Sequence, residues 1–291
     1  MKKVLSLSLA LAMTASLTAC GGSASAPSPS AAPGASPAVS EAPEAQPVEL
    51  TVFAAASLEA SLIEIAANYQ KVAPHVTISY NFDSSGTLKT QIEEGADCDL
   101  FISAAQKQMN ALDAADTTGT NEKGLDFVRS DTRIDLVQNQ VVLAVPDDNP
   151  RDIQSFADLA TDKLELICLG NDDVPVGAYS LEILDSLDID IAALEGAGKV
   201  TYASNVSEVA TQVKEGAVDC GIIYATDANT YELTVVDQAE DGMCKKVVYP
   251  AAAMKSGPEE NQAAAEDFLT YLHTNPQAAA VLEDVGFTVL P

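Results

Sequence analysis

Extended apolar segments alternate with helical patterns along most of this chain, and the alternation restricts the possible folds more than any other feature. Parallel strands need long crossover connections, which are usually helices, so the pattern predicts sheets flanked by helices. The expected strands are 49–55, 76–82, 99–104, 135–146, 163–170, 199–203, 219–225 and 245–253. The expected helices are about 58–72, 87–94, 107–115, 156–160, 178–187, 206–215, 260–273 and 277–284. We therefore expect an α/β fold.

The pattern restarts near residue 135, which indicates a second lobe. Each lobe is expected to be a mostly parallel sheet flanked by helices, with a ligand cleft between the two. We expect the two C-terminal helices to return and complete the first lobe. Lobe I would then comprise 49–135 and 247–291, and lobe II would comprise 136–246, with crossings near 135 and 247.

The first residues have the features of a secretory signal. Lys2 and Lys3 precede an apolar stretch that is too short to span a membrane and that ends in small residues before Cys20. The ending Leu17-Thr18-Ala19-Cys20 resembles the bacterial lipobox, which implies a signal peptide over 1–19 and a lipid on Cys20. An ordinary signal with an incidental cysteine is the alternative.

Residues 20–48 are rich in Ala, Ser, Pro and Gly and cannot bury enough apolar area to repay their ordering entropy. We expect them to form a flexible linker. With a lipid on Cys20, this linker would hold the folded part at the outer face of the cell membrane, outside the cytoplasm.

Charge and cysteine spacing exclude several classes of function. The formal net charge is −28, so the basic surface that nucleic-acid binding requires is missing. Cys98, Cys168, Cys220 and Cys244 form no CxxC pair and lie far from the two histidines in sequence, which argues against a zinc site. These four cysteines could form disulfides or remain buried thiols, and the sequence leaves both possibilities open.

Five loops share one position, because each follows an expected strand and opens a helix or a turn. In open α/β sheets ligands bind at that edge, where helix N-termini offer free N–H groups. None of the five contains Lys or Arg, and they offer instead small residues and the hydroxyls of Ser57, Ser85 and Tyr224. The loops are 54–58, 83–88, 171–180, 203–209 and 224–228.

Each member of this set also has a structural interpretation. Ser57 and Ser85 could cap helices, and Asn205 is expected to cap the helix that begins at Val206. Tyr224 could be a core aromatic residue at the end of a strand. The joint pattern carries more weight than any one residue, and it predicts a ligand site made of neutral hydrogen-bond donors.

Several segments resemble the periplasmic molybdate-binding proteins of ABC transporters, which are type II solute-binding proteins with a two-lobed periplasmic-binding-protein fold. The resemblance covers about 50–287. It rests on the segments "TVFAAASL", "SSGTL", "ADCDLFISAAQKQM", "DDVPVGAY", "GIIYATDA" and "KKVVYPAA".

The resemblance implies that the two lobes close on molybdate or tungstate, so that molybdenum is held only as an oxyanion and no further cofactor is needed. It also implies a monomer that delivers its ligand to ABC permease subunits in the membrane. Val176 stands where the family often has alanine, and the backbone N–H donor is the same for either residue. The implied donors are the hydroxyls of Ser57, Ser85 and Tyr224 and the backbone amides of Ser57, Ser85, Val176 and Val206.

Four aspartates in the same loops test this interpretation: Asp83, Asp172, Asp173 and Asp227. We expect all four to point outward, since an inward carboxylate would repel a dianion. If they face inward, a metal-cation-binding protein is the better hypothesis. A carboxylate in the cavity would also accept the proton of phosphate, which a shell of donors alone would reject.

A serine hydrolase is the alternative from another class of protein. It needs a base beside its nucleophile, and neither His75 nor His273 is placed for Ser57 or Ser85. The chain also has no GxxxxGK[ST] phosphate-binding loop. We therefore expect a binding protein rather than an enzyme.

Overall fold

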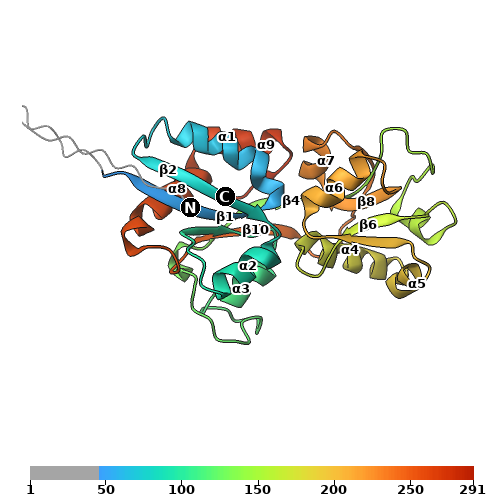
Figure 1. Cartoon of the computed structure of the whole chain (residues 1–291), viewed down its shortest axis with the longest axis horizontal. Helices are drawn as coiled ribbons and strands as arrows, with labels where there is room; N and C mark the ends of the chain where they lie inside the picture. Colours follow the sequence, from blue (N-terminus) through green and yellow to red (C-terminus); the bar gives the residue numbers. More distant parts are fainter. Residues whose placement is uncertain (1–45) are drawn as a thin grey trace, which may run out of the picture. The chain divides into compact units, whose positions relative to one another are not determined.

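A computed structural model describes residues 46–291. These residues form two β-sheets with helices packed on them, which confirms the expected two-lobed α/β architecture (Figure 1). The expected signal peptide, Cys20 and most of the expected linker lie outside the described residues. No helix in the described part is long and apolar enough to cross a membrane.

The first sheet has six strands in the order β11-β4-β10-β3-β1-β2. β1 pairs in parallel with β2 and β3, whereas β10 is antiparallel to β3 and β4, and β11 is antiparallel to β4. The strands are β1 Val48–Ala55, β2 Val76–Asp83, β3 Leu100–Ile102, β4 Ile134–Asn139, β10 Val247–Ala253 and β11 Thr288–Val289.

The second sheet has five strands in the order β7-β6-β8-β5-β9. Only β6 pairs in parallel, with β7 and β8. β5 is antiparallel to β8 and β9. The strands are β5 Val141–Val145, β6 Ile167–Gly170, β7 Val200–Ala203, β8 Cys220–Tyr224 and β9 Thr234–Gln238.

Both sheets are therefore mixed, and the expectation of mostly parallel sheets was wrong. The antiparallel pairs involve the strands at the two passages between the sheets, β4, β5, β9 and β10. β4 leaves the first sheet and β10 enters it again, while β5 enters the second sheet and β9 leaves it. The outgoing and returning strands run in opposite directions, so they pair in the antiparallel sense. The parallel part of each sheet consists of the strands that helices do connect.

Helices cover both faces of the first sheet: α1, α8 and α9 lie on one side, and α2 and α3 on the other (Figure 1). The alternation of side chains along β1 explains this arrangement. Val52 and Ala54 belong to the core that includes α1 and α8, whereas Phe53 packs with Leu88 of α2 and the apolar face of α3. In the second lobe α4 and α6 pack on β6 and β8. The helices are α1 Glu59–Tyr69, α2 Ser85–Glu93, α3 Gln106–Leu112, α4 Pro175–Ser186, α5 Ile191–Gly196, α6 Val206–Lys214, α7 Ala225–Thr230, α8 Gln262–Thr274 and α9 Pro276–Asp284.

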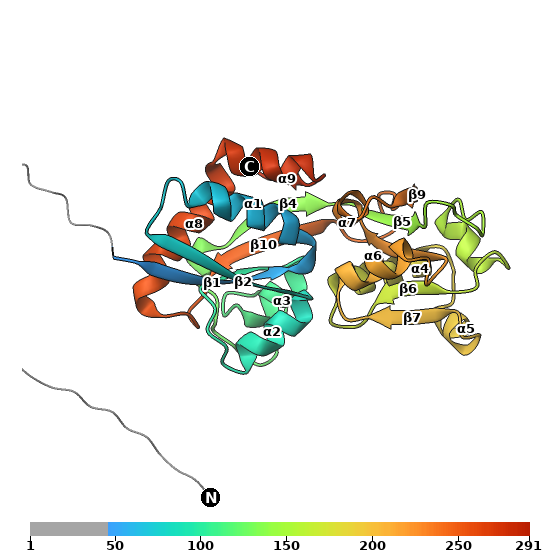
Figure 2. The ribbon, with the colours of Figure 1, turned by 45° about the horizontal axis from the view of Figure 1, so that its top comes forward.

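The polypeptide passes from the first sheet to the second at a single residue, Gln140, which separates β4 from β5 (Figure 2). The expected single strand 135–146 is therefore two strands in different sheets, and the expected boundary at 135 lies inside β4. The chain returns through residues 239–246 and enters the first sheet again with β10, at Val247.

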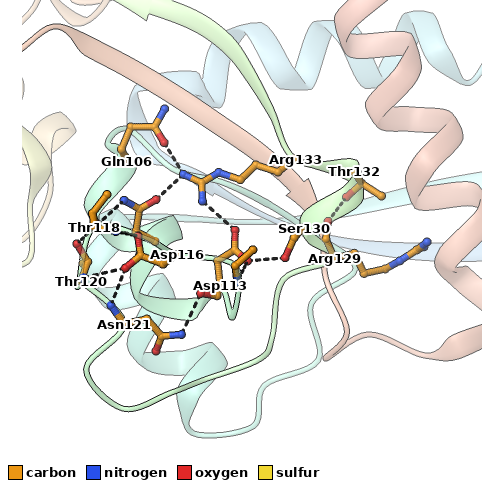
Figure 3. Close-up of polar contacts among 12 residues, drawn as sticks. Gln106, Asp113, Asp116, Thr118, Thr120, Asn121, Arg129, Ser130, Thr132 and Arg133 are labelled. Carbon is orange, nitrogen blue, oxygen red and sulfur yellow. Dashed lines mark hydrogen bonds and ion pairs between the residues drawn. The ribbon is translucent and has the colours of Figure 1, made fainter.

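Polar contacts hold the long connection between α3 and β4 (Figure 3). The Arg133 guanidinium donates to Asp113 at 2.9 Å and to the side-chain oxygens of Gln106 and Asn110 at 2.5 Å each. The carboxylate of Asp116 accepts backbone N–H groups from residues 118, 120 and 121. This connection is ordered by its own side chains and contributes nothing to the cavity described below.

All four cysteines of the described part are free thiols, and Cys98, Cys168 and Cys220 are buried. Burial raises the pKa of the Cys168 thiol to about 12, so it stays protonated at neutral pH. Of the two possibilities left open by the sequence, the structure contains the buried thiols.

Candidate functional site

A small cavity lies where the carboxyl ends of strands from both sheets meet. The volume of this cavity is about 10 Å³. All five loops predicted from the sequence contribute residues to its wall. Among the described residues, no Lys or Arg lines this cavity. The lining residues are Ala55, Ala56, Ser57, Asp83, Ser84, Ser85, Ala104, Val174, Pro175, Val206 and Tyr224.

Four of the five predicted site residues thus line one cavity: Ser57, Ser85, Val206 and Tyr224. Val176 is fully buried and follows the lining residue Pro175 in the first turn of α4. The alanines at the end of β1 keep this wall bare, since Ala55 and Ala56 place only methyl groups beside Ser57.

The first turns of α2, α4 and α6 aim backbone donors at this region. The first N–H groups of a helix have no acceptor within the helix. Each helix satisfies its third N–H locally: Ser84 accepts from Thr87, Asn205 accepts from Glu208, and the carbonyl of Val174 accepts from Gly177. The earlier amides of Ser85, Val176 and Val206 have no acceptor in their own helices. Partial positive charge at the helix N-termini makes all three suitable for an anion.

The two serines are not helix caps. The cap of α2 is Ser84, while Ser85 is the first residue of the helix and its Oγ accepts the N–H of Ala104 at 2.9 Å. The Oγ of Ser57 lies 2.8 Å from the hydroxyl of Tyr249. Asn205 does cap α6, as predicted.

Tyr224 ends β8 with its hydroxyl in the interior. The residue is 1% exposed, and its hydroxyl has no hydrogen-bond partner in the described chain. Burial raises the pKa of this phenol well above its usual range, so it remains a donor at neutral pH. A buried donor without a partner in the cavity wall is the feature expected of a ligand-binding group.

The aspartates divide into two pairs. Asp172 and Asp173 are exposed, as expected. Asp83 instead belongs to the cavity wall, where its Oδ1 accepts the N–H of Ser84 at 2.7 Å. Asp227 is 3% exposed, and its Oδ2 has no hydrogen-bond partner in the described chain. The expectation that all four point outward was therefore wrong for Asp227, while Asp83 is half-buried at the cavity wall.

The positions of Asp83 and Asp227 have physical reasons. Asp83 is the last residue of β2 and cannot leave the carboxyl edge of the sheet. Asp227 lies in the first turn of α7 and lines a neighbouring cavity with Ser57 and Ser207. Burial raises the pKa of Asp227 to about 7, which leaves much of it neutral near physiological pH. The expected rejection of protonated phosphate stays a prediction, and it depends on the Asp83 carboxylate accepting no proton from the ligand.

The histidines lie elsewhere. His75 lines a cavity with Tyr69 and Tyr271, and His273 lines another with Glu266. No group of three or more His, Cys, Asp or Glu side chains that could hold a metal ion occurs among residues 46–291.

Sequence reasoning missed three residues around the site. Tyr249 contacts the hydroxyl of Ser57, and Asn139 in turn donates to Tyr249. The N–H of Gly86 donates to the carbonyl of Asp173 at 2.9 Å, and this hydrogen bond joins α2 to the loop before α4. Tyr249 belongs to "KKVVYPAA", one of the segments that carry the resemblance, but nothing in its local pattern indicates a role.

Comparison with known proteins gives concordant results. Residues 50–288 match the sequence profile described as "Bacterial extracellular solute-binding protein". A Bacillus subtilis protein provisionally named as an ABC transporter substrate-binding lipoprotein is 36% identical over 83% of this chain and 86% of its own length. The molybdate-binding protein ModA of Escherichia coli is 32% identical over 83% of this chain and 89% of its own.

Among solved structures, a substrate-binding domain provisionally assigned to a molybdenum ABC transporter of Clostridium difficile is similar to this chain. It has 35% sequence identity and a TM-score of 0.61, and the match covers 84% of this chain and all of that one.

Proposed function

The chain belongs to the family of bacterial extracellular solute-binding proteins, and on that premise we propose that it captures molybdate, and also tungstate, for delivery to an ABC transporter permease. Family membership also confirms the expectation of a binding protein rather than an enzyme. One observation carries the ligand assignment. The unpartnered Tyr224 hydroxyl shares a cavity with two serines and with helix N-termini from both sheets.

This donor set suits a tetrahedral oxyanion. Each oxygen of a dianion accepts hydrogen bonds, and charge-assisted bonds of this kind are about twice as strong as neutral ones. Neutral donors and helix N-termini satisfy the charge without a fixed cation, which allows release of the ligand to a transporter. The relatives named for molybdate binding or molybdenum transport support the choice of oxyanion.

A metal cation is the second candidate, since Asp83 lies in the wall. Cation sites in proteins are built mainly from several oxygen ligands, and carboxylates are the usual charged ones. The cavity supplies one carboxylate among several N–H and O–H donors, so the oxyanion is the better fit.

Calorimetric titration of the purified protein tests the assignment. We expect molybdate and tungstate to bind much more tightly than sulfate, because a smaller anion cannot reach donors on both sides and each unpaired buried donor costs about 1–3 kcal/mol. Displacement of bound molybdate by equimolar sulfate would contradict the size argument. Binding of ferric iron in place of any oxyanion would favour the cation hypothesis.

We also propose that Cys20 is lipidated and holds the protein at the outer face of the cell membrane as a monomer. The Bacillus subtilis relative named as a lipoprotein supports the anchor. Mass spectrometry of the membrane fraction should find an acylated N-terminal peptide beginning at Cys20, and Cys20→Ala should abolish it. Recovery of unmodified parent protein in the soluble fraction would refute the anchor.

A further inference from the structure

A partly buried chain of hydrogen bonds connects Ser57 to both passages between the sheets. The Tyr249 hydroxyl lies 2.8 Å from the Oγ of Ser57. The Nδ2 of Asn139 donates to the Tyr249 hydroxyl at 3.2 Å and to the Oγ1 of Thr226 at 2.8 Å. Asn139 is the last residue of β4, Tyr249 lies in β10, and Thr226 lies in α7 of the second lobe. The chain therefore ends on a cavity-lining hydroxyl.

The orientation of the Asn139 amide determines the direction of these bonds. Its Oδ1 accepts the backbone N–H of Gln140 at 2.8 Å, so the nitrogen faces Tyr249 and Thr226. An amide nitrogen only donates, and it has two protons for these two partners. The oxygen of Tyr249 must therefore accept from Asn139.

The single proton of Tyr249 is then available for Ser57. Tyr249 is fully buried, and burial raises the pKa of its phenol well above the usual range, so the proton is retained. When this proton is donated to the Oγ of Ser57, the proton of Ser57 itself is left for the cavity. Ser85 has the same arrangement, because its Oγ accepts the N–H of Ala104.

We propose, on the basis of the proposed function, that Tyr249 is a positioning residue that makes Ser57 a hydrogen-bond donor toward the bound oxyanion. An anion has no proton to give, so a serine that turned its lone pairs toward it would repel it. Because the Oγ of Ser57 already accepts a hydrogen bond from Tyr249, the anion is the favourable partner for the proton of Ser57. The orientation is established before the ligand arrives, and binding need not reorganise it.

A double-mutant cycle tests this role, with molybdate titrated calorimetrically into four proteins: parent, Tyr249→Phe, Ser57→Ala and the double variant. We expect Tyr249→Phe to weaken binding about tenfold in the parent and by less than about twofold when Ser57 is already alanine. Loss of the bond to Asn139 would lower thermal stability in both backgrounds, so the difference in affinity isolates the effect that passes through Ser57.

Tyr80→Phe is the matched control, because the Tyr80 hydroxyl donates to the Leu62 carbonyl at 3.0 Å, away from the cavity. It should leave the affinity for molybdate unchanged. Equal losses from Tyr249→Phe with and without Ser57, or no loss in the parent, would overturn the positioning role while leaving the proposed function intact. A parent protein that binds neither molybdate nor tungstate would instead overturn the proposed function, and this inference with it.

Discussion

Replacement of Gly86 by alanine should prevent the two lobes from closing fully. Gly86 lies in the first turn of α2, and its N–H donates to the carbonyl of Asp173, before α4, at 2.9 Å. A Cβ at this position would lie 2.4 Å from that carbonyl oxygen and 2.6 Å from the Cα of Asp173. Both contacts are with backbone atoms, so no side-chain rotation can relieve them.

The size of the effect follows from these distances. Restoring an ordinary contact of 3.4 Å requires the two loops to separate by about 1 Å. Such a shift breaks the hydrogen bond between Gly86 and Asp173 and moves donors on one side of the cavity out of reach of a shared ligand. Losing two hydrogen bonds to a charged ligand costs about 3–6 kcal/mol, so the affinity for molybdate should fall by about two to four orders of magnitude.

Calorimetry and small-angle scattering together check the prediction. The parent should bind molybdate and decrease in radius of gyration, whereas Gly86→Ala should bind weakly and stay expanded at saturating ligand. Gly196→Ala is the matched control, since a Cβ at Gly196 meets nothing within 4 Å. Parent-like affinity of Gly86→Ala would show that the lobes do not approach through this contact when the ligand is bound, and the reasoning would be wrong.

Three further substitutions probe the site. Tyr224→Phe removes only the unpartnered hydroxyl, so calorimetry should show a loss of about 1.5–3 kcal/mol in molybdate binding with unchanged folding, and unchanged affinity would remove Tyr224 from the site. Ser85→Ala removes a donor and also the acceptor of the Ala104 N–H, so both molybdate affinity and melting temperature should fall; a loss of stability alone would make Ser85 structural. The pKa of Asp227 is raised to about 7 in the folded protein, because burial disfavours its ionised form. Its contribution to the free energy of unfolding is therefore fully present below about pH 4 and is lost, by about 4 kcal/mol, as the pH rises through 7. In urea unfolding at several pH values, Asp227→Asn should remove this pH dependence. The neighbouring phenols of Tyr224 and Tyr249 stay protonated and Glu59 is exposed. A pH dependence that persists in the variant would contradict the assignment to Asp227.

The convergence of the five loops on one cavity could be predicted because it depends on topology rather than on individual contacts. Loops at the carboxyl edge of a sheet converge whatever their exact partners, and their lack of cationic residues indicated neutral donors. The predicted start of α4 was wrong, since the helix was expected from about residue 178 and begins at Pro175. Proline is favoured at the first helical position, so this start was available from the sequence.

The break at Gln140 could not be predicted in the same way. Apolar residues occur on both sides, and the polar run of three residues at 138–140 is compatible with one continuous strand. β4 and β5 are separate strands because they pair in different sheets. Local strand propensity cannot predict which sheet a segment joins. The hydrogen bonds of Asn139 to Thr226 and Tyr249 depend on this break, since they need both passages to lie together. The positioning role of Tyr249 is therefore hidden from sequence reasoning for the same reason as the break.

Asp227 differs from these cases, because a local pattern did indicate where it would lie. Tyr224 precedes the first residue of α7, and Asp227 lies three residues later in the first turn. Residues three apart at the start of a helix share a face, so a prediction that directs the Tyr224 hydroxyl inward also directs Asp227 inward. Repulsion from a dianion forbids this position only for an ionised carboxyl. Burial raises the pKa of Asp227 to about 7, so the carboxyl can lie beside the proposed oxyanion site in its neutral form. It becomes unfavourable there as the pH rises above about 7.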